Sequence, residues 1–187
     1  MRQPYPTSPN ARVPLFALAN DVDPARLNFD HVLFLDFDGV LHPESGDPDA
    51  WFCFSPNFFE VLQHAAPKAD VPVVISSTWR MTSTIDALRE HFPVAMHHQI
   101  VGVTPDLDVV WEPRAHMNRQ TEIEAWIREV SPHGDWLAID DRPSLFDPDC
   151  KRLFVVPPCR PGHGAGLNLD VSEDLKVALR DFLNPPA

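Results

Sequence analysis

The sequence predicts an α/β fold, a three-layer Rossmann-like sandwich with a central parallel sheet of about five strands. Short apolar runs alternate along the chain with segments of helical periodicity, and parallel strands need helical crossovers to connect them. Several of the apolar runs end in acidic or hydroxyl residues. Because ligands of such sheets bind beyond the carboxyl ends of the strands, these polar residues mark the expected site.

The composition is that of a globular protein whose 187 residues suffice for one domain with a sizeable core. We assign the proline-rich residues 1–28 to an N-terminal arm, which packs through Leu15, Phe16 and Leu18, and residues 29–187 to the main domain. No apolar run approaches the roughly 18 residues of a membrane span, and the start lacks the features of a secretory signal. We therefore expect a cytoplasmic protein with no membrane partner.

The net charge and the cysteine content give information on binding partners and on the state of the thiols. The net charge of −12 argues against a large nucleic-acid footprint, since phosphate backbones favour basic surfaces. The three cysteines lack metal-binding spacing, which favours reduced thiols.

The first expected strand lies in the run from His31 to Leu35 and continues into Asp36-Phe37-Asp38-Gly39. Side chains alternate along a strand, so the carboxylates of Asp36 and Asp38 project to the same side. Gly39 permits a sharp turn directly after them. Asp-Gly is also common in ordinary turns, and the later segments decide between the two interpretations.

The next segments alternate as the fold requires. Ser55 is expected to cap a helix that runs to about Ala66, and Val71 to Ile75 form a second strand that ends in Ser76-Ser77. A helix over 83–91 and a third strand within 94–103 follow.

The C-terminal part supplies the remaining elements. A helix opens at Asn118 or Thr121, and a fourth strand over 136–139 ends in Asp140-Asp141. A fifth strand covers 153–156. The last helix opens at Asp170, with Glu173 in the position of a capping box.

Taken together, these segments resemble the haloacid dehalogenase-like (HAD) superfamily of phosphohydrolases over roughly residues 30–156. DFDGVL is similar to the first motif of the family, a strand ending in serine to the second, and a basic residue before an Asp-Asp pair to the third and fourth. ISSTWR, RQTEIEAWI and LAIDD resemble more narrowly the capless HAD domains associated with RNA-repair systems. The short segments between the motifs leave no room for a folded cap.

The resemblance implies a role for each acid. Asp36 is the nucleophile that forms an aspartyl-phosphate, and Asp38 is the general acid and then the general base. The implied cofactor is Mg²⁺, with Asp36 and Asp140 as side-chain ligands and Asp38 as a ligand through its main-chain carbonyl. Asp141 contributes through water or by orienting the basic residue.

The residues expected to bind the phosphate are less sharply defined. Ser76 is expected to donate a hydrogen bond to the phosphate, with Ser77 as the alternative, although both could simply cap the next helix. Arg119 is expected to stabilise the phosphoryl charge, with Arg114 as its competitor.

Two residues after the second strand are expected near the rim of the site. Trp79 and Arg80 are candidates for contacts with the substrate, although a core tryptophan beside an exposed arginine is an equally good interpretation. His42 and Trp51, in the loop after the first strand, are further candidate contacts.

The resulting hypothesis is an Mg²⁺-dependent phosphatase that hydrolyses a phosphomonoester, either a phosphorylated small molecule or a nucleic-acid end. A phosphotransferase would use the same residues. A non-catalytic HAD-fold module that binds a partner is the alternative from another class, favoured by the proline-rich arm. The presence of Asp38 and of the Asp140-Asp141 pair argues against a dehalogenase.

Overall fold

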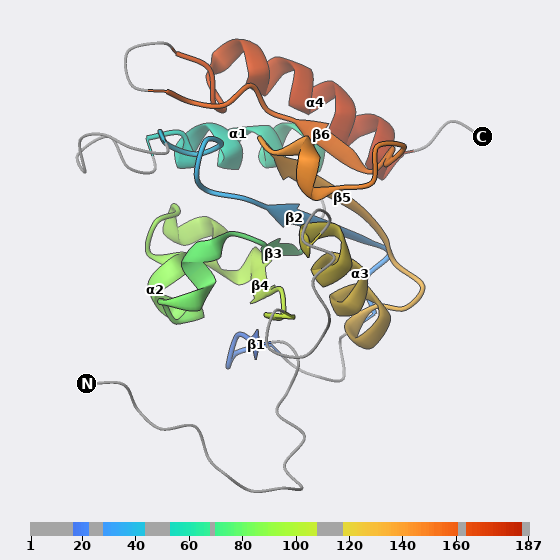
Figure 1. Ribbon diagram of the computed structural model, residues 1–187. Coiled ribbons are helices and arrows are strands. Elements are labelled where there is room, and N and C mark those ends of the chain that lie inside the picture. Colours follow the sequence, from blue (N-terminus) through green and yellow to red (C-terminus); the bar gives the residue numbers. More distant parts are fainter. Residues whose placement is uncertain are drawn as a thin grey trace, which may run out of the picture.

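The computed structural model of the protein describes residues 17–22, 28–43, 53–67, 70–107, 118–160 and 164–184. Within these residues a six-stranded sheet has the order β1-β4-β3-β2-β5-β6, with helices on both faces (Figure 1). This architecture confirms the predicted α/β sandwich. No cap domain is inserted in the part of the chain that the structure describes.

The central strand β2 (His31–Leu35) pairs in parallel with β3 (Val73–Ile75) on one side and β5 (Asp135–Asp140) on the other. The parallel sheet extends to β4 (Ile100–Val103) and β6 (Leu153–Val155). The chain thus builds one half of the sheet, crosses over β2 and then builds the other half. This reversal of strand order beside β2 is where α/β sheets bind their ligands.

Apolar side chains that alternate along the strands form two cores, one on each face of the sheet. Leu33 and Leu35 of β2 pack under α1 (Ser55–Ala65) and α4 (Leu169–Leu183), whereas Val32 and Phe34 pack under α3 (Asn118–Val130). The short α2 (Ile85–Arg89) and the 3₁₀ helix η4 (Val94–Gln99) add Leu88 and Met96 to the first core. The parallel strands are therefore covered on both faces, as their nearly continuous apolar runs require.

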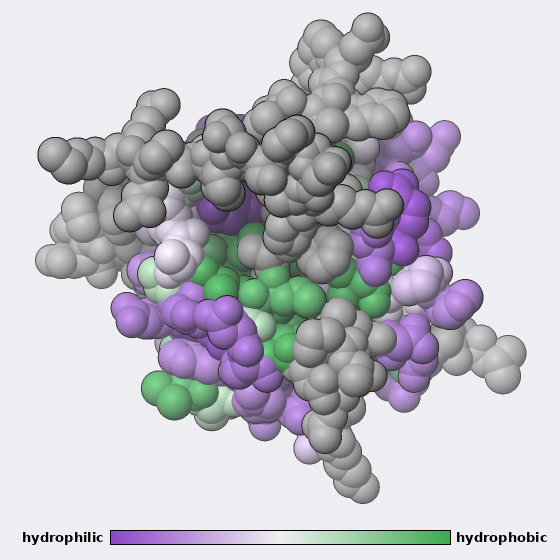
Figure 2. Space-filling view, turned by 90° about the horizontal axis from the view of Figure 1, so that it is seen from below, coloured by the Kyte–Doolittle hydropathy of each residue, from purple (hydrophilic) through white to green (hydrophobic). Residues whose placement is uncertain are grey.

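The segment assigned to the N-terminal arm contributes a strand of its own. β1 (Ala17–Leu18) pairs antiparallel with β4 at the edge of the sheet, and Leu18 packs against the second core. Leu15 and Phe16 lie outside the described residues, and the boundary at residue 28 stays a prediction. Seen from below the view of Figure 1, the side of the molecule to which β1 belongs has apolar residues in its middle, between hydrophilic ones (Figure 2).

Two predicted helix starts are corrected by the structure. Ser55 is the first residue of α1 and not its cap: Phe54 precedes the helix, and no side chain caps it. The last helix begins at Leu169, and its cap is Asn168, whose side-chain oxygen accepts a hydrogen bond from the Val171 amide. The predicted capping box was therefore wrong, because a cap two residues earlier satisfies the first turn. Among the described residues, no helix has the length and apolar character needed to cross a membrane.

Candidate active site

Asp36 and Asp140 lie side by side at the carboxyl ends of two neighbouring strands. The register of β2 and β5 pairs Leu35 with Ile139, so the next residue on each strand comes to the same level. Both side chains share the parity of Phe34 and Ala138 and thus point to the face covered by α3. Asp36 is 3% exposed and Asp140 0%, so two buried carboxylates share one small volume.

A single arginine bridges this pair. Arg119, in the first turn of α3, places Nη1 2.6 Å from Asp36 Oδ2 and 2.6 Å from Asp140 Oδ2. Burial disfavours the charge on the Arg119 guanidinium, but the carboxylates of Asp36 and Asp140 outweigh it and raise its pKa. Arg119 is therefore a fixed cation in the site. Its competitor Arg114 lies outside the described residues.

Asp141 completes a cluster of carboxylates. Asp36, Asp140 and Asp141 each offer an oxygen, and these atoms lie within 4.8 Å of one another. Asp36 Oδ1 is buried and accepts no hydrogen bond from the residues that the structure describes. The three carboxylates carry more negative charge than Arg119 carries positive charge. All the atoms that could coordinate a metal here are carboxylate oxygens. Such a donor set fits a hard divalent cation such as Mg²⁺.

Electrostatics make the cluster costly without a cation. Burial raises the pKa of Asp140 from 3.8 to about 7, and the neighbouring Asp36 carboxylate adds to the rise. Arg119 and the Arg142 amide, which donates to Asp140 Oδ1 at 2.7 Å, oppose it. An acid with a pKa raised on folding holds its proton more tightly in the folded state. Its contribution to stability is present below about pH 4 and is lost as pH rises through about 7.

We therefore expect Mg²⁺ to raise the melting temperature of the protein more at pH 8 than at pH 5. At pH 8 the carboxylates are ionised, and the cation both relieves their repulsion and meets no competition from protons. At a hundredfold excess over its dissociation constant, a ligand stabilises the folded state by about 2.7 kcal/mol. Thermal melts at both pH values, with and without Mg²⁺, measure the difference. An equal gain at both pH values, or an undiminished gain in Asp140→Asn, contradicts the assignment.

Gly39 makes room for Asp141. Its φ of +78° is in the left-handed region, and a Cβ at this position would lie 2.2 Å from Asp141 Oδ2. Gly39→Ala is expected to destabilise the fold by roughly 1–3 kcal/mol and to weaken Mg²⁺ binding by displacing Asp141. Gly164→Ala is the matched control, because Gly164 has a similar φ of +67° but no described atom within 4 Å of its Cβ. Denaturant unfolding and Mg²⁺ titration compare the two variants. Equal Mg²⁺ affinity in both would show that Gly39 does not position Asp141.

The Asp38 side chain lies beside the carboxylate cluster and is not part of it. It is 31% exposed, and both of its oxygens accept hydrogen bonds from Trp79 Nε1, at 3.1 and 3.2 Å. His42 Nε2 is 3.6 Å from Asp38 Oδ1. Asp38 thus differs from the three buried acids in being partly open to solvent.

The two serines follow β3 at the same end of the sheet. The Ser76 amide donates to Leu35 O at 2.9 Å, which continues the ladder by one residue and sets Ser76 at the level of Asp36. Ser77 Oγ is buried and has no hydrogen-bond partner among the described residues. Ser77 also makes no side-chain cap for the 3₁₀ helix η3 (Thr78–Met81). Helix capping therefore does not account for Ser77.

Arg80 faces inward and not toward the rim. Its Nη2 lies 2.6 Å from Glu122 Oε1, and its side chain is 7% exposed. The guanidinium also donates to main-chain carbonyls, at 2.9 Å for Ser77 and 3.1 Å for Thr104. These contacts use the donors that a substrate would need, so the geometry does not favour the expected contact with substrate. Arg80 instead links the end of β3 to α3 through Glu122, which lies one turn after Arg119 on that helix.

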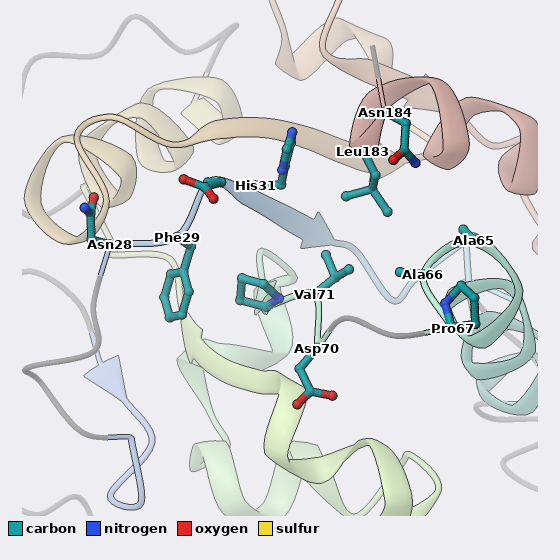
Figure 3. Close-up of a pocket in the computed structure, with 12 residues that line it drawn as sticks. Asn28, Phe29, His31, Ala65, Ala66, Pro67, Asp70, Val71, Leu183 and Asn184 are labelled. Atoms are coloured by element: carbon teal, nitrogen blue, oxygen red, sulfur yellow. The ribbon is translucent and has the colours of Figure 1, made fainter. Parts of the chain in front are cut away.

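A hollow elsewhere in the molecule lies far from this chemistry. It is lined by residues such as Asp30, His31 and Val71, which lie at the amino ends of β2 and β3, and by Leu183 at the end of α4 (Figure 3). The length of the strands separates it from Asp36 and Asp140. The candidate active site is therefore the carboxyl edge of the sheet.

Sequence reasoning missed two features of this site. The contact between Trp79 and Asp38 joins residues that are 41 positions apart, and no local pattern encodes it. The pairing of Arg80 with Glu122 is the second. The only sequence signal for it is that the expected helix places Glu122 one turn after Arg119, on the same side of the helix and thus facing the site. Trp51 lies outside the described residues.

One of three comparisons with known proteins identifies a family for the chain. A search of curated proteins gave no match, and a search of solved structures gave none either. A family model described as the HAD domain in Swiss Army Knife RNA repair proteins matches residues 32–162. This range begins in β2, ends after β6 and includes every residue of the acid cluster together with Arg119. The chain belongs to this family of HAD domains.

Proposed function

We propose that the protein is an Mg²⁺-dependent phosphatase that hydrolyses a phosphomonoester through an aspartyl-phosphate on Asp36. The observation that carries this proposal is the meeting of Asp36, Asp140, Asp141 and Arg119 where the strand order reverses. Membership of a HAD family points to the same class of enzyme.

The cation would be held by Asp36 and Asp140, with Asp141 beside them and the main-chain carbonyl of Asp38 as a further ligand. When bound, Mg²⁺ would offset the repulsion between the acids and the incoming phosphate and polarise the phosphoryl group. The buried oxygen of Asp36 that accepts no hydrogen bond from the described residues supports this assignment.

The reaction would proceed in two balanced steps. A carboxylate oxygen of Asp36 attacks phosphorus, the bond to the leaving oxygen breaks, and Asp38 gives that oxygen its proton. Water then attacks the phosphorus of the aspartyl-phosphate, Asp38 takes a proton from this water, and inorganic phosphate leaves as the Asp36 carboxylate is restored. Asp38 ends each cycle protonated, as it began.

The neighbouring groups would bind the phosphoryl oxygens. Arg119 would supply a positive charge beside the nucleophile, held there by its ion pairs with Asp36 and Asp140 at 2.6 Å. Ser76 and Ser77, which follow the neighbouring strand β3, would supply hydroxyl donors. The buried Ser77 hydroxyl has no hydrogen-bond partner among the described residues, which supports such a role.

The family suggests which substrates to test first. Because the matching family model describes RNA repair proteins, we propose a phosphorylated nucleic-acid end as the substrate, with phosphorylated small molecules as the alternative. The absence of an inserted cap from the described residues leaves room for a large substrate.

A panel of phosphomonoesters tests the proposal. The purified protein with Mg²⁺ is expected to release inorganic phosphate from p-nitrophenyl phosphate and faster from a 3′- or 5′-phosphorylated oligonucleotide. Acid quenching during turnover is expected to trap phosphate on the protein. Release without a trapped phosphoprotein contradicts the covalent mechanism, and no release from any member contradicts the phosphatase. Transfer to an added alcohol in place of water would assign a phosphotransferase.

A further inference from the structure

The carboxylate of Asp38 is held by an indole. Trp79 Nε1 lies 3.1 Å from Asp38 Oδ1 and 3.2 Å from Oδ2, so its hydrogen points between the two oxygens. An indole N–H can only donate, so Asp38 accepts in this contact whether its carboxyl group is ionised or protonated. We propose that Trp79 is a positioning residue that keeps Asp38 oriented for proton transfer. This inference rests on the proposed phosphatase function.

The indole itself is fixed by a set of rings. Its centroid lies 5.6 Å from that of His42, 5.7 Å from that of His91 and 6.4 Å from that of Phe37. The two histidine rings meet it edge to face, at 73° and 84°, an arrangement that aromatic pairs prefer. Burial lowers the pKa of His91, which favours the neutral ring in this packing. Trp79 is therefore itself held in place.

The loop after Asp38 brings a second ring to its carboxylate. The Gly39 amide donates to His42 O at 2.9 Å, which folds this loop back beside Asp38. His42 Nδ1 lies 2.8 Å from Pro43 O, and this contact holds the ring with Nε2 facing Asp38. Asp38 thus lies next to both an imidazole on its own loop and an indole from beyond β3, and the two rings pack against each other.

Such support matters because Asp38 is the most exposed acid of the site. A half-buried aspartate without a fixed donor samples several rotamers, whereas proton transfer requires hydrogen-bond reach of the leaving oxygen. While one oxygen of Asp38 delivers the proton, the other can still accept from the indole. Loss of the N–H should therefore slow proton transfer without removing the acid.

Trp79→Phe tests the inference through the chemistry of the leaving group. For these two-step reactions kcat/KM reports the steps up to departure of the leaving group. An alkyl alcohol needs a proton to depart, whereas p-nitrophenolate does not. We expect Trp79→Phe to lower kcat/KM about tenfold or more for an alkyl phosphate and less than about threefold for p-nitrophenyl phosphate. Equal losses on both substrates overturn the positioning role.

Two further variants separate positioning from general damage. Trp136→Phe is the matched control, since Trp136 lies on β5 far from Asp140 and packs against Phe34 and Arg152. It should lower both rates equally if at all. In an Asp38→Asn background, Trp79→Phe should cause little further loss on the alkyl phosphate, because the two residues act as a unit. Losses that simply multiply overturn the inference.

A spectroscopic readout keeps the contact testable apart from activity. With ¹⁵N-labelled tryptophan, the indole N–H resonance of Trp79 should move in Asp38→Ala, while that of Trp136 should not. An unmoved Trp79 resonance overturns the contact whether or not the protein releases phosphate. A moved resonance in a protein that releases no phosphate rejects the proposed function and, with it, the catalytic purpose of the contact.

Discussion

Asp36→Asn is expected to abolish phosphate release while the protein stays folded. An amide has no ionised oxygen to attack phosphorus, and loss of a nucleophile reduces turnover by roughly 10⁴–10⁶. The asparagine keeps the shape of the side chain, and Asp140 still pairs with Arg119 at 2.6 Å. We therefore expect a cooperative melt, no trapped phosphoprotein and no release above background in a malachite-green or p-nitrophenol assay.

The matched control is Asp135→Asn, at the other end of β5. Asp135 pairs with Arg152 at 2.7 Å, and both side chains are at least half exposed, so its removal should cost little stability and no activity. Phosphate release by Asp36→Asn at the wild-type rate would show that another group is the nucleophile. Loss of activity in both variants would instead point to a general effect on the fold.

Arg119→Met is expected to lower kcat by roughly 10²–10³ at saturating Mg²⁺, the usual cost of removing one charge-stabilising donor. The methionine fills much of the space but leaves Asp36 and Asp140 without the guanidinium that pairs with both. Without Mg²⁺ the variant should melt at a lower temperature than wild type, because buried carboxylates left unpaired are costly. Steady-state kinetics and thermal melts across a range of Mg²⁺ concentrations measure both effects.

A lysine at this position should rescue part of the activity. Arg119→Lys restores a positive charge but not the planar group that can bind two oxygens, so we expect a loss of about tenfold or less. Arg128→Met is the control on the same helix, since its side chain is 69% exposed. If Arg119→Met keeps wild-type kcat and melts normally, Arg119 has no part in the chemistry.

Site residues at the ends of strands could be predicted from the sequence, whereas the position of the Arg119 side chain depends on how a helix packs on the sheet. Asp36, Asp140 and Ser76 end strands whose apolar runs are visible in the sequence, and the rules of parallel sheets bring such ends to one edge. Arg119 was predicted together with Arg114 as its competitor, and only the packing of α3 on β2 and β5 brings the Arg119 guanidinium onto both carboxylates.

Local signals were weaker at the helix ends. Ser55-Pro56 reads as a cap followed by the first turn, but the helix begins at Ser55 itself. Asn168 takes the capping role that Asp170 and Glu173 were expected to fill. Neighbouring Ser, Asn and Asp side chains are all able to cap, so the backbone path and not the residue type selects among them.

The amino-acid sequence alone determined the α/β class, the order of the main strands and helices, and the acids at the strand ends. These follow from the periodicity of apolar residues, which is a local property. Only the tertiary structure decided that Arg80 turns inward to Glu122 and that Trp79 holds Asp38. Those contacts join residues 41 or more positions apart, and they depend on how η3, α3 and the loop after β2 pack together. No short stretch of sequence specifies that packing.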